Sequence, residues 1–266
     1  MQPKILIPMG YGLNCENETA YAFTSVGGKA DKVHLSEVFA KPSILEDYQV
    51  LAMVGGFSFG DHIAAGKVLA NRYRYHLAEQ LELFMANGKL IIGICNGFQS
   101  MVQYGLLPRF DDSSEQLVSL AQNDSGVLED RWVTLAANTD SRCIFTQNLR
   151  SLELPVRHGE GKLVVRDKGV LQRLWTQGQV ALQYLDPTTG KATMKYPLNP
   201  NGSVDSIAGI CDSTGRVFGL MPHPEAYNNP YNHPNWLLQR QAKSLPSEGL
   251  GLQIFRNAIE YVQRNL

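Results

Sequence analysis

Cys95 lies between two glycines in the sequence GICNG, after an apolar run and before a helix-like segment. Gly93 and Gly97 flank it with the spacing of a nucleophile elbow, in which the reactive residue occupies a sharp turn from strand to helix. Neighbours without side chains let the two elements approach closely, and the N-terminal amides of a helix favour a thiolate. The pattern indicates a nucleophilic cysteine, and the backbone N–H of Asn96 would stabilise the oxyanion that its attack creates. The alternative is a small apolar cysteine that ends a strand.

A histidine and a glutamate follow a second apolar run, in the sequence GLMPHPE. His223 and Glu225 are two residues apart, so they project on the same side of an extended segment, and the prolines beside His223 restrict its backbone. With Cys95 they would form a Cys-His-Glu triad, in which His223 is the acid and base and Glu225 orients its imidazole. The alternative is a capped strand whose His and Glu are exposed to solvent.

The glycine-rich sequence GGFSFGD, residues 55–61, follows a third apolar run. In open parallel sheets, ligands bind beyond the carboxyl ends of the strands, where this loop would meet the Cys95 turn and the His223 segment. Gly55 and Gly56 would let backbone amides approach a substrate carbonyl. The alternative is an ordinary turn in which Phe57 and Phe59 pack.

Two further groups of residues could do chemistry. His158 and Glu160 form a close pair in RHGEGKL, and we expect them to shape the entrance to the site or a subunit interface, although they could form an acid-base pair. Cys15, in a glycine-containing loop, is the rival nucleophile, but no apolar strand runs directly into it. Cys143 and Cys211 follow ordinary core patterns.

Composition excludes several classes of function. The 266 residues carry a formal net charge of -1 and no run of Lys or Arg, so we expect neither nucleic acid nor a membrane as a partner. The N-terminal apolar stretch is too short for a secretory signal or a spanning helix, which predicts a cytoplasmic protein. The four cysteines are scattered without a CxxC pair, and the remaining histidines have no metal-ligand spacing, so no metal is expected.

Strand-like and helix-like segments alternate through the first hundred residues, which predicts an α/β fold with an open, mostly parallel, flavodoxin-like sheet and helices on both faces. The segment 32–38 reads as a strand and 109–130 as a polar loop. From about Trp132, short strand-like runs predict extra β structure in the C-terminal half, and the last sixteen residues predict an amphipathic helix. With no linker or repeat, we expect one domain, 1–266.

Four stretches carry a resemblance to a known family: GGFSFGD, GICNGFQ, RHGEG with the later YPLNPNGS, and GRVFGLMPHPE. The chain resembles the class I (triad) glutamine amidotransferase family, and within it the glutaminase subunits of phosphoribosylformylglycinamidine synthase. The likeness runs over nearly the whole chain. It departs at Ala226, where an arginine is common, and at GLNCE in place of GSNCD, and residues 110–131 match little, which suggests an insertion at an interface.

The resemblance implies a function and roles. Cys95 would attack the side-chain amide of L-glutamine, with His223 and Glu225 completing the triad, Gly56 and Asn96 forming the oxyanion hole, and Gln99 contacting the substrate. Ammonia would pass to a synthetase subunit that uses ATP and magnesium to amidate formylglycinamide ribonucleotide, in a complex that could include a small accessory subunit.

This chain has no Walker A sequence, so no cofactor is expected in it. Two alternatives remain open: a stand-alone cysteine hydrolase or peptidase of the same architecture, and a catalytically silent interaction subunit.

Overall fold

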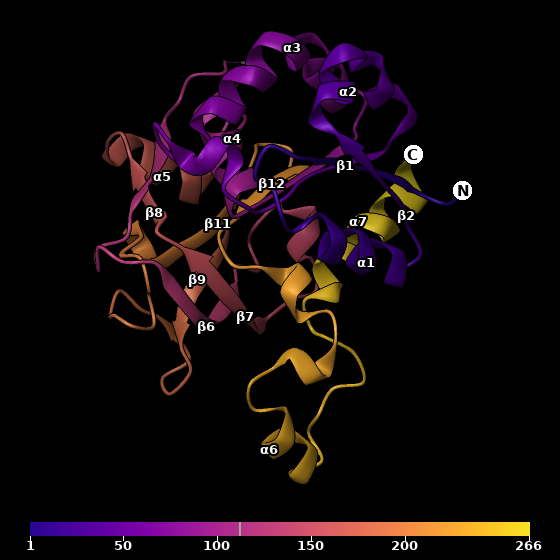
Figure 1. Cartoon of the computed structure of the whole chain (residues 1–266). Helices are drawn as coiled ribbons and strands as arrows, with labels where there is room; N and C mark the ends of the chain where they lie inside the picture. Colours follow the sequence, from indigo (N-terminus) through magenta and orange to yellow (C-terminus); the bar gives the residue numbers. More distant parts are fainter. Residues whose placement is uncertain (112) are drawn as a thin grey trace.

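Buried apolar runs form the parallel half of the central sheet in the computed structural model, which describes residues 1–111 and 113–266 (Figure 1). All residues of three of its strands are buried, as expected for strands covered on both faces. Parallel pairing joins five strands in the spatial order β2-β1-β3-β4-β12. These strands are β1 (Lys4–Met9), β2 (Lys29–His34), β3 (Val50–Met53), β4 (Leu90–Ile94) and β12 (Val217–Leu220).

The C-terminal half extends the same sheet with antiparallel strands, in the order β12-β11-β9-β6-β7. The strands are β6 (Glu129–Ala137), β7 (Ser151–His158), β9 (Val180–Asp186) and β11 (Ile207–Cys211), and β10 (Lys191–Ala192) pairs with β9. The predicted α/β class, the open sheet and the extra β structure are confirmed. Strand β12 joins the parallel and antiparallel halves.

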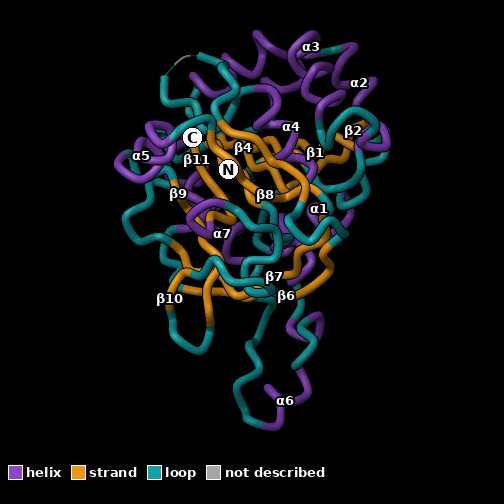
Figure 2. The backbone as a smooth tube through the Cα atoms, turned by 90° about the vertical axis from the view of Figure 1, so that its left-hand side faces the viewer, coloured by secondary structure: helices purple, strands orange, loops and turns teal. Residues whose placement is uncertain are grey.

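Helices cover both faces of the parallel half. Figures 1 and 2 show α2 (Leu35–Ala40), α3 (Lys67–Ala86) and α4 (Asn96–Tyr104) on one side and α1 (Glu16–Ser25) and α7 (Leu252–Asn265) on the other. The expected C-terminal amphipathic helix is α7. Its Phe255 packs edge-on against Phe23 of α1, with 4.8 Å between the ring centroids. A further helix, α5 (Lys168–Thr176), follows β8 (Glu160–Val165).

Two expectations about local structure were wrong. The segment 32–38 is not one strand: β2 ends at His34, whose side chain accepts a hydrogen bond from Ser36 N and so begins α2. The segment 109–130 is not all loop, because Val118–Gln122 forms β5, which pairs with β8 in a separate two-stranded sheet. Residue 112 of that segment lies outside the described residues.

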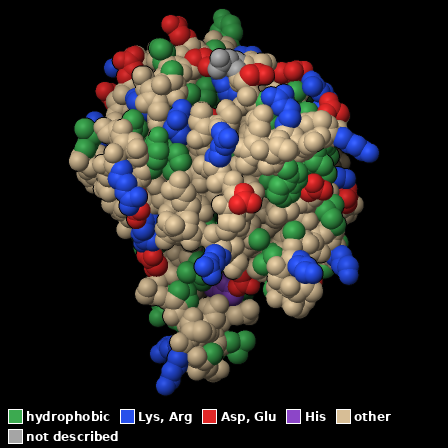
Figure 3. Space-filling model, turned by 180° about the vertical axis from the view of Figure 1, so that it is seen from behind, with side chains coloured by type: hydrophobic (Ala, Val, Ile, Leu, Met, Phe, Trp, Pro, Cys, Tyr) green, Lys and Arg blue, Asp and Glu red, His purple; other side chains and the backbone are tan. Residues whose placement is uncertain are grey.

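Residues 228–250 leave the body of the molecule as an arm that carries the short helix α6 (Trp236–Gln241) (Figures 1 and 3). The arm is fixed at its base by His233, whose Nε2 lies 2.8 Å from Glu153 Oε2 and whose ring packs on Trp132 and Tyr227. In the described chain, no helix is both long and apolar enough to cross a bilayer.

The close contact between α4 and β3 generates a prediction about stability. A methyl group at Gly97 would collide with the backbone carbonyl of Met53. Gly97→Ala should therefore lower the free energy of unfolding by about 1–3 kcal/mol, which is the usual cost of overpacking. Urea denaturation measures this difference. Gly159→Ala is the control, because a methyl group there would meet open space. Equal stability of the two variants would contradict the proposed packing.

Candidate active site

Cys95 occupies the predicted corner between β4 and α4. Its backbone has φ 51 and ψ -106, a strained conformation for a residue with a side chain, and it is the N-cap of the helix. Its N–H donates to Leu220 O at 2.9 Å, which ties the corner to the end of the neighbouring strand β12. The strand-turn-helix arrangement that the glycine spacing predicts is present, and its nucleophile candidate lies beside the end of β12.

His223 and Glu225 follow directly from that end. Because Leu220 pairs with Ile94 in parallel register, the segments after β12 and β4 emerge at the same edge of the sheet. His223 N donates to Pro155 O of β7, and the His223 Nδ1 and Glu225 Oε1 atoms are 2.6 Å apart, with both side chains buried. Glu225 thereby holds the Nδ1–H tautomer and leaves Nε2 without a partner among the described residues.

The three triad candidates are brought together around Gly55. A methyl group at Gly55 would lie 3.0 Å from His223 Cε1 and 3.5 Å from Cys95 Cβ. Burial by itself lowers the pKa of His223, but the Glu225 carboxylate and the Cys95 and Cys15 thiols raise it more, so the pKa lies well above its ordinary value. A protonated imidazole stabilises a thiolate beside it, which is the reactive form of a cysteine.

Cys15 also reaches this site, which sequence reasoning did not predict. Its Sγ atom would lie 3.1 Å from a methyl group at Gly55. The same Sγ atom lies within 4.8 Å of a ring nitrogen of His223 and of a carboxylate oxygen of Glu225. The loop before α1 is held there because Asn14 N donates to Gly55 O. Burial raises the pKa of the Cys15 thiol, and the charge of Glu225 adds to the rise, although the hydrogen bond to His223 lowers it.

A cavity of about 150 Å³ lies beside Cys95 and is not lined by Cys15. The two thiols therefore differ in access to the cavity, because a substrate bound there would contact Cys95 and not Cys15. Larger cavities occur elsewhere, but none of the predicted site residues line them. The lining residues are Gly56, Phe57, Asp61, Ala65, Cys95, Gln99, Leu128, Arg157, His158, Gly159 and Glu160.

The predicted oxyanion and substrate residues lie on this cavity or next to it. Gly56 has φ +147, which a residue with a side chain rarely adopts, and a methyl group there would crowd Gly12 and Leu13. The N–H of Asn96 belongs to the first turn of α4, where no intrahelical acceptor exists. Gln99 lines the cavity, but its amide donates to Glu160 O and accepts from Asn96 Nδ2, so both of its polar atoms have protein partners.

His158 and Glu160 line the same cavity but do not pair with each other. His158 Nδ1 lies 3.1 Å from Asn123 Oδ1, whereas Glu160 Oε2 accepts a hydrogen bond from Ala65 N at 3.0 Å. Burial, followed by the nearby His223, lowers the pKa of His158 to about 3. His158 is therefore a neutral imidazole at physiological pH.

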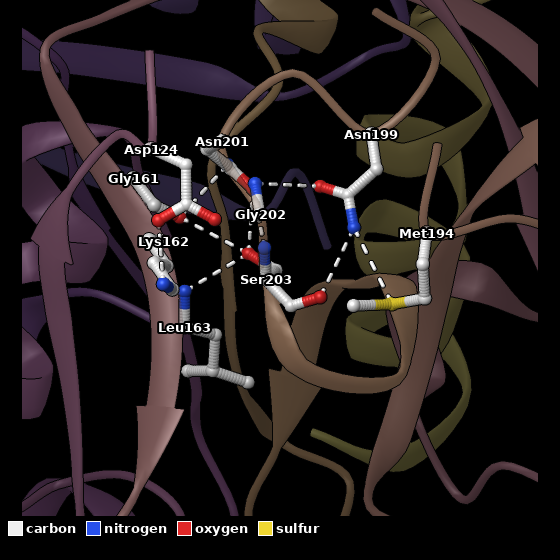
Figure 4. A network of polar contacts seen from close by, with 9 residues as sticks. All are labelled: Asp124, Gly161, Lys162, Leu163, Met194, Asn199, Asn201, Gly202 and Ser203. Carbon is white, nitrogen blue, oxygen red and sulfur yellow. Dashed lines mark hydrogen bonds and ion pairs between the residues drawn. The ribbon is translucent and has the colours of Figure 1, made fainter. Parts of the chain in front are cut away.

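The sequence YPLNPNGS braces the strand that carries Glu160 (Figure 4). Asn201 Nδ2 donates to Gly161 O at 2.9 Å, and Ser203 Oγ accepts from Leu163 N at 2.9 Å. Asn199 closes the turn by accepting from Gly202 N. Asn201 and Ser203 thus hold the first residues of β8 in place, and with them one wall of the cavity.

Residues 2–262 match the family model of the CobB/CobQ-like glutamine amidotransferase domain. The chain belongs to this family. Among curated relatives of this glutamine amidotransferase domain, the phosphoribosylformylglycinamidine synthase subunit PurQ of Dehalococcoides mccartyi is 44% identical over 261 residues, with 98% of each chain covered. The subunit of the same name from Methanococcus maripaludis is 40% identical over 270 residues, again with 98% of each chain covered.

Solved structures agree with the family and the fold. A chain in the structure of PurLQS from Thermotoga maritima superposes with a TM-score of 0.71 at 28% identity, covering 98% of this chain and 100% of that one. Another glutamine amidotransferase from Thermotoga maritima, at a TM-score of 0.57 and 14% identity, shares the fold, covering 98% of each chain. The resemblance inferred from the four sequence stretches is confirmed.

The depressed pKa of His158 predicts a pH dependence of stability. An unfolded histidine has a pKa near 6.5, so between pH 6.5 and about 3 the unfolded chain binds one proton that the folded chain does not. Stability should therefore fall as the pH drops below 6.5, by up to about 1.4 kcal/mol per pH unit from this residue. His158→Gln should reduce that slope in urea denaturation at pH 4 to 7.

The same substitution at the exposed His62 controls for the loss of a histidine as such. If His158→Gln keeps the slope of the unsubstituted chain, His158 is not buried as a neutral group.

Proposed function

We propose that this chain is the glutaminase subunit of a phosphoribosylformylglycinamidine synthase, which releases ammonia from L-glutamine for a synthetase subunit. Two findings support this function. The curated relatives carry this subunit's name and match over nearly the full length of both chains, and a chain of the PurLQS structure also matches over nearly the full length. The observation that carries it is the position of Cys95, at a strained corner beside a buried His223–Glu225 pair and open to a small cavity.

The reaction follows from that arrangement. Cys95 Sγ, as the thiolate, attacks the side-chain amide carbon of glutamine, and the N–H groups of Gly56 and Asn96 stabilise the resulting oxyanion. His223 gives its proton to the departing nitrogen, so that ammonia leaves and a glutamyl thioester remains on Cys95. His223 then takes a proton from water, whose oxygen attacks the thioester and releases glutamate. Glu225 keeps the imidazole oriented through both steps.

The cavity favours this reaction over hydrolysis of peptides. Its volume of about 150 Å³ is smaller than the ~300–1,000 Å³ of typical ligand pockets, which suits one amino acid better than a polypeptide. In the proposed complex, the ammonia amidates formylglycinamide ribonucleotide on the synthetase subunit, which would bind ATP and magnesium. A small accessory subunit, a cytoplasmic location and a single glutaminase domain over residues 1–266 belong to the same proposal.

The proposed function is tested by replacing, one at a time, the two cysteines that lie near the His223 imidazole. Cys95→Ala should lower glutamine-dependent synthesis by the reconstituted complex at least about 10³-fold, because the nucleophile is lost. Synthesis from added ammonium salt should be unchanged, because the synthetase does not need the thiol. Product formation is measured with each nitrogen source.

Cys15→Ala is the matched control, because it removes the other thiol beside His223 without removing the one that faces the cavity. It should retain glutamine-dependent synthesis. Labelled glutamine should form a thioester on Cys95, detected by mass spectrometry. Loss of ammonium-dependent synthesis in Cys95→Ala, or label on Cys15, would contradict the proposed function or its site.

A further inference from the structure

Two carboxylates that the triad does not use line the cavity beside Cys95. Asp61 ends the short helical turn Ser58–Asp61, and Glu160 begins β8. Neither carboxylate forms an ion pair with any residue in 1–111 or 113–266. Burial raises the pKa of Asp61, and the charge of nearby Glu160 adds to the rise. Two carboxylates without an ion-pair partner among the described residues therefore line one small cavity.

Both carboxylates are held in fixed positions. Asp61 Oδ1 accepts a hydrogen bond from Asn96 Nδ2 at 3.1 Å, and Asp61 also accepts one from the backbone N–H of Gly66. Glu160 accepts from Ala65 N through its side chain and from Gln99 through its backbone carbonyl. Groups fixed in this way lose little conformational entropy when a ligand binds.

A third residue of the cavity lining, His158, carries a buried acceptor without a partner among the described residues. His158 is 2% exposed, and its Nε2 has no partner among the described residues. Asn123 Nδ2 donates to Val127 O and His158 O, so Asn123 Oδ1 is the acceptor that faces His158 Nδ1. The proton of the neutral imidazole is therefore on Nδ1, and Nε2 is an acceptor. A buried acceptor without a donor is costly, and a donor on a ligand would satisfy it.

We propose that Asp61 and Glu160 bind the α-ammonium group of the substrate amino acid, an inference that rests on the proposed glutaminase function. An ammonium group offers three donors and one positive charge, which matches two carboxylates without an ion-pair partner on one cavity, next to a lining histidine whose Nε2 is an unsatisfied acceptor.

One cation, Arg157, is among the residues that line the cavity. Arg157 Nε lies 3.9 Å from Asp130 Oδ1, and both side chains are more than half exposed, so that ion pair is weak. Arg157 is therefore available to the α-carboxylate while Asp61 and Glu160 hold the α-ammonium. The cavity then selects free glutamine over amides that lack a charged amino group, including glutamine inside a peptide chain.

The test compares two ligands in the full chain carrying Cys95→Ala, which binds without turnover. The ligands are L-glutamine and 5-amino-5-oxopentanoate, which is glutamine without its α-ammonium group. Calorimetry should show about tenfold to hundredfold tighter binding of glutamine, the usual effect of charge-assisted hydrogen bonds. Adding Asp61→Asn or Glu160→Gln should reduce this preference at least about fivefold, by weakening glutamine and leaving the analogue nearly unchanged.

Asp124→Asn is the matched control, because Asp124 is a carboxylate near the same wall that pairs with Lys162 and does not line the cavity. It should keep the full preference for glutamine. In the reconstituted complex with Cys95 intact, Asp61→Asn should raise KM for glutamine while kcat and ammonium-dependent synthesis hold. A merely structural role for Asp61 would not separate these quantities.

Each other outcome overturns the inference. If Asp61→Asn and Glu160→Gln weaken both ligands equally, or keep the preference for glutamine, the carboxylates do not bind the α-ammonium group, and the proposed function stands. If the Cys95→Ala chain binds no glutamine with or without the synthetase, and the unsubstituted complex makes no product from glutamine, the inference and the proposed function fall together.

Discussion

The site depends on one backbone constraint, the sharp corner at Cys95. A residue with a side chain is held at φ 51 because its N–H bonds to Leu220, its neighbours β4 and α4 are packed on both sides, and Gly97 lets the helix touch β3. The strain keeps the thiol at the mouth of the cavity and points the first helix N–H groups toward the same space. Everything else in the site is arranged around that fixed sulfur.

Electrostatic interactions give opposite pKa shifts to two histidines that lie close together, His223 and His158. His223 has a buried carboxylate on Nδ1 and thiols nearby, so its protonated form is stabilised. Burial disfavours the protonated form of His158, and its neighbours, an amide on Nδ1 and another imidazole, do not offset that effect. The same type of side chain is therefore suited to carry a proton in one position and to accept a hydrogen bond in the other. Their different partners, rather than their burial, set the difference.

The sequence predicted those features that depend on local patterns. Continuous apolar runs before Gly55, Cys95 and Pro222 marked strands buried on both faces, and the glycines around Cys95 marked the corner. The β2–α2 boundary was missed because the apolar residues Leu35 and Val38 suit either a strand or a helix. Strand β5 was missed because its pairing partner, β8, is distant in the chain. Cys15, Asp61 and Arg157 lie within the stretches GLNCE, GGFSFGD and RHGEG, but no spacing marked them as neighbours of the cavity, and only the folded loops bring them to the site.

The place of β12 in the sheet also bears on how the protein is made. This strand lies between β4 and β11, yet its residues, Val217–Leu220, come late in the chain. Until β12 is in place, the edge of β4 is open, the Cys95 N–H lacks its Leu220 acceptor, and no imidazole lies beside the sulfur. Insertion of β12 closes that edge and delivers His223 in the same event. The three triad candidates can therefore come together only once the parallel and antiparallel halves of the sheet have joined.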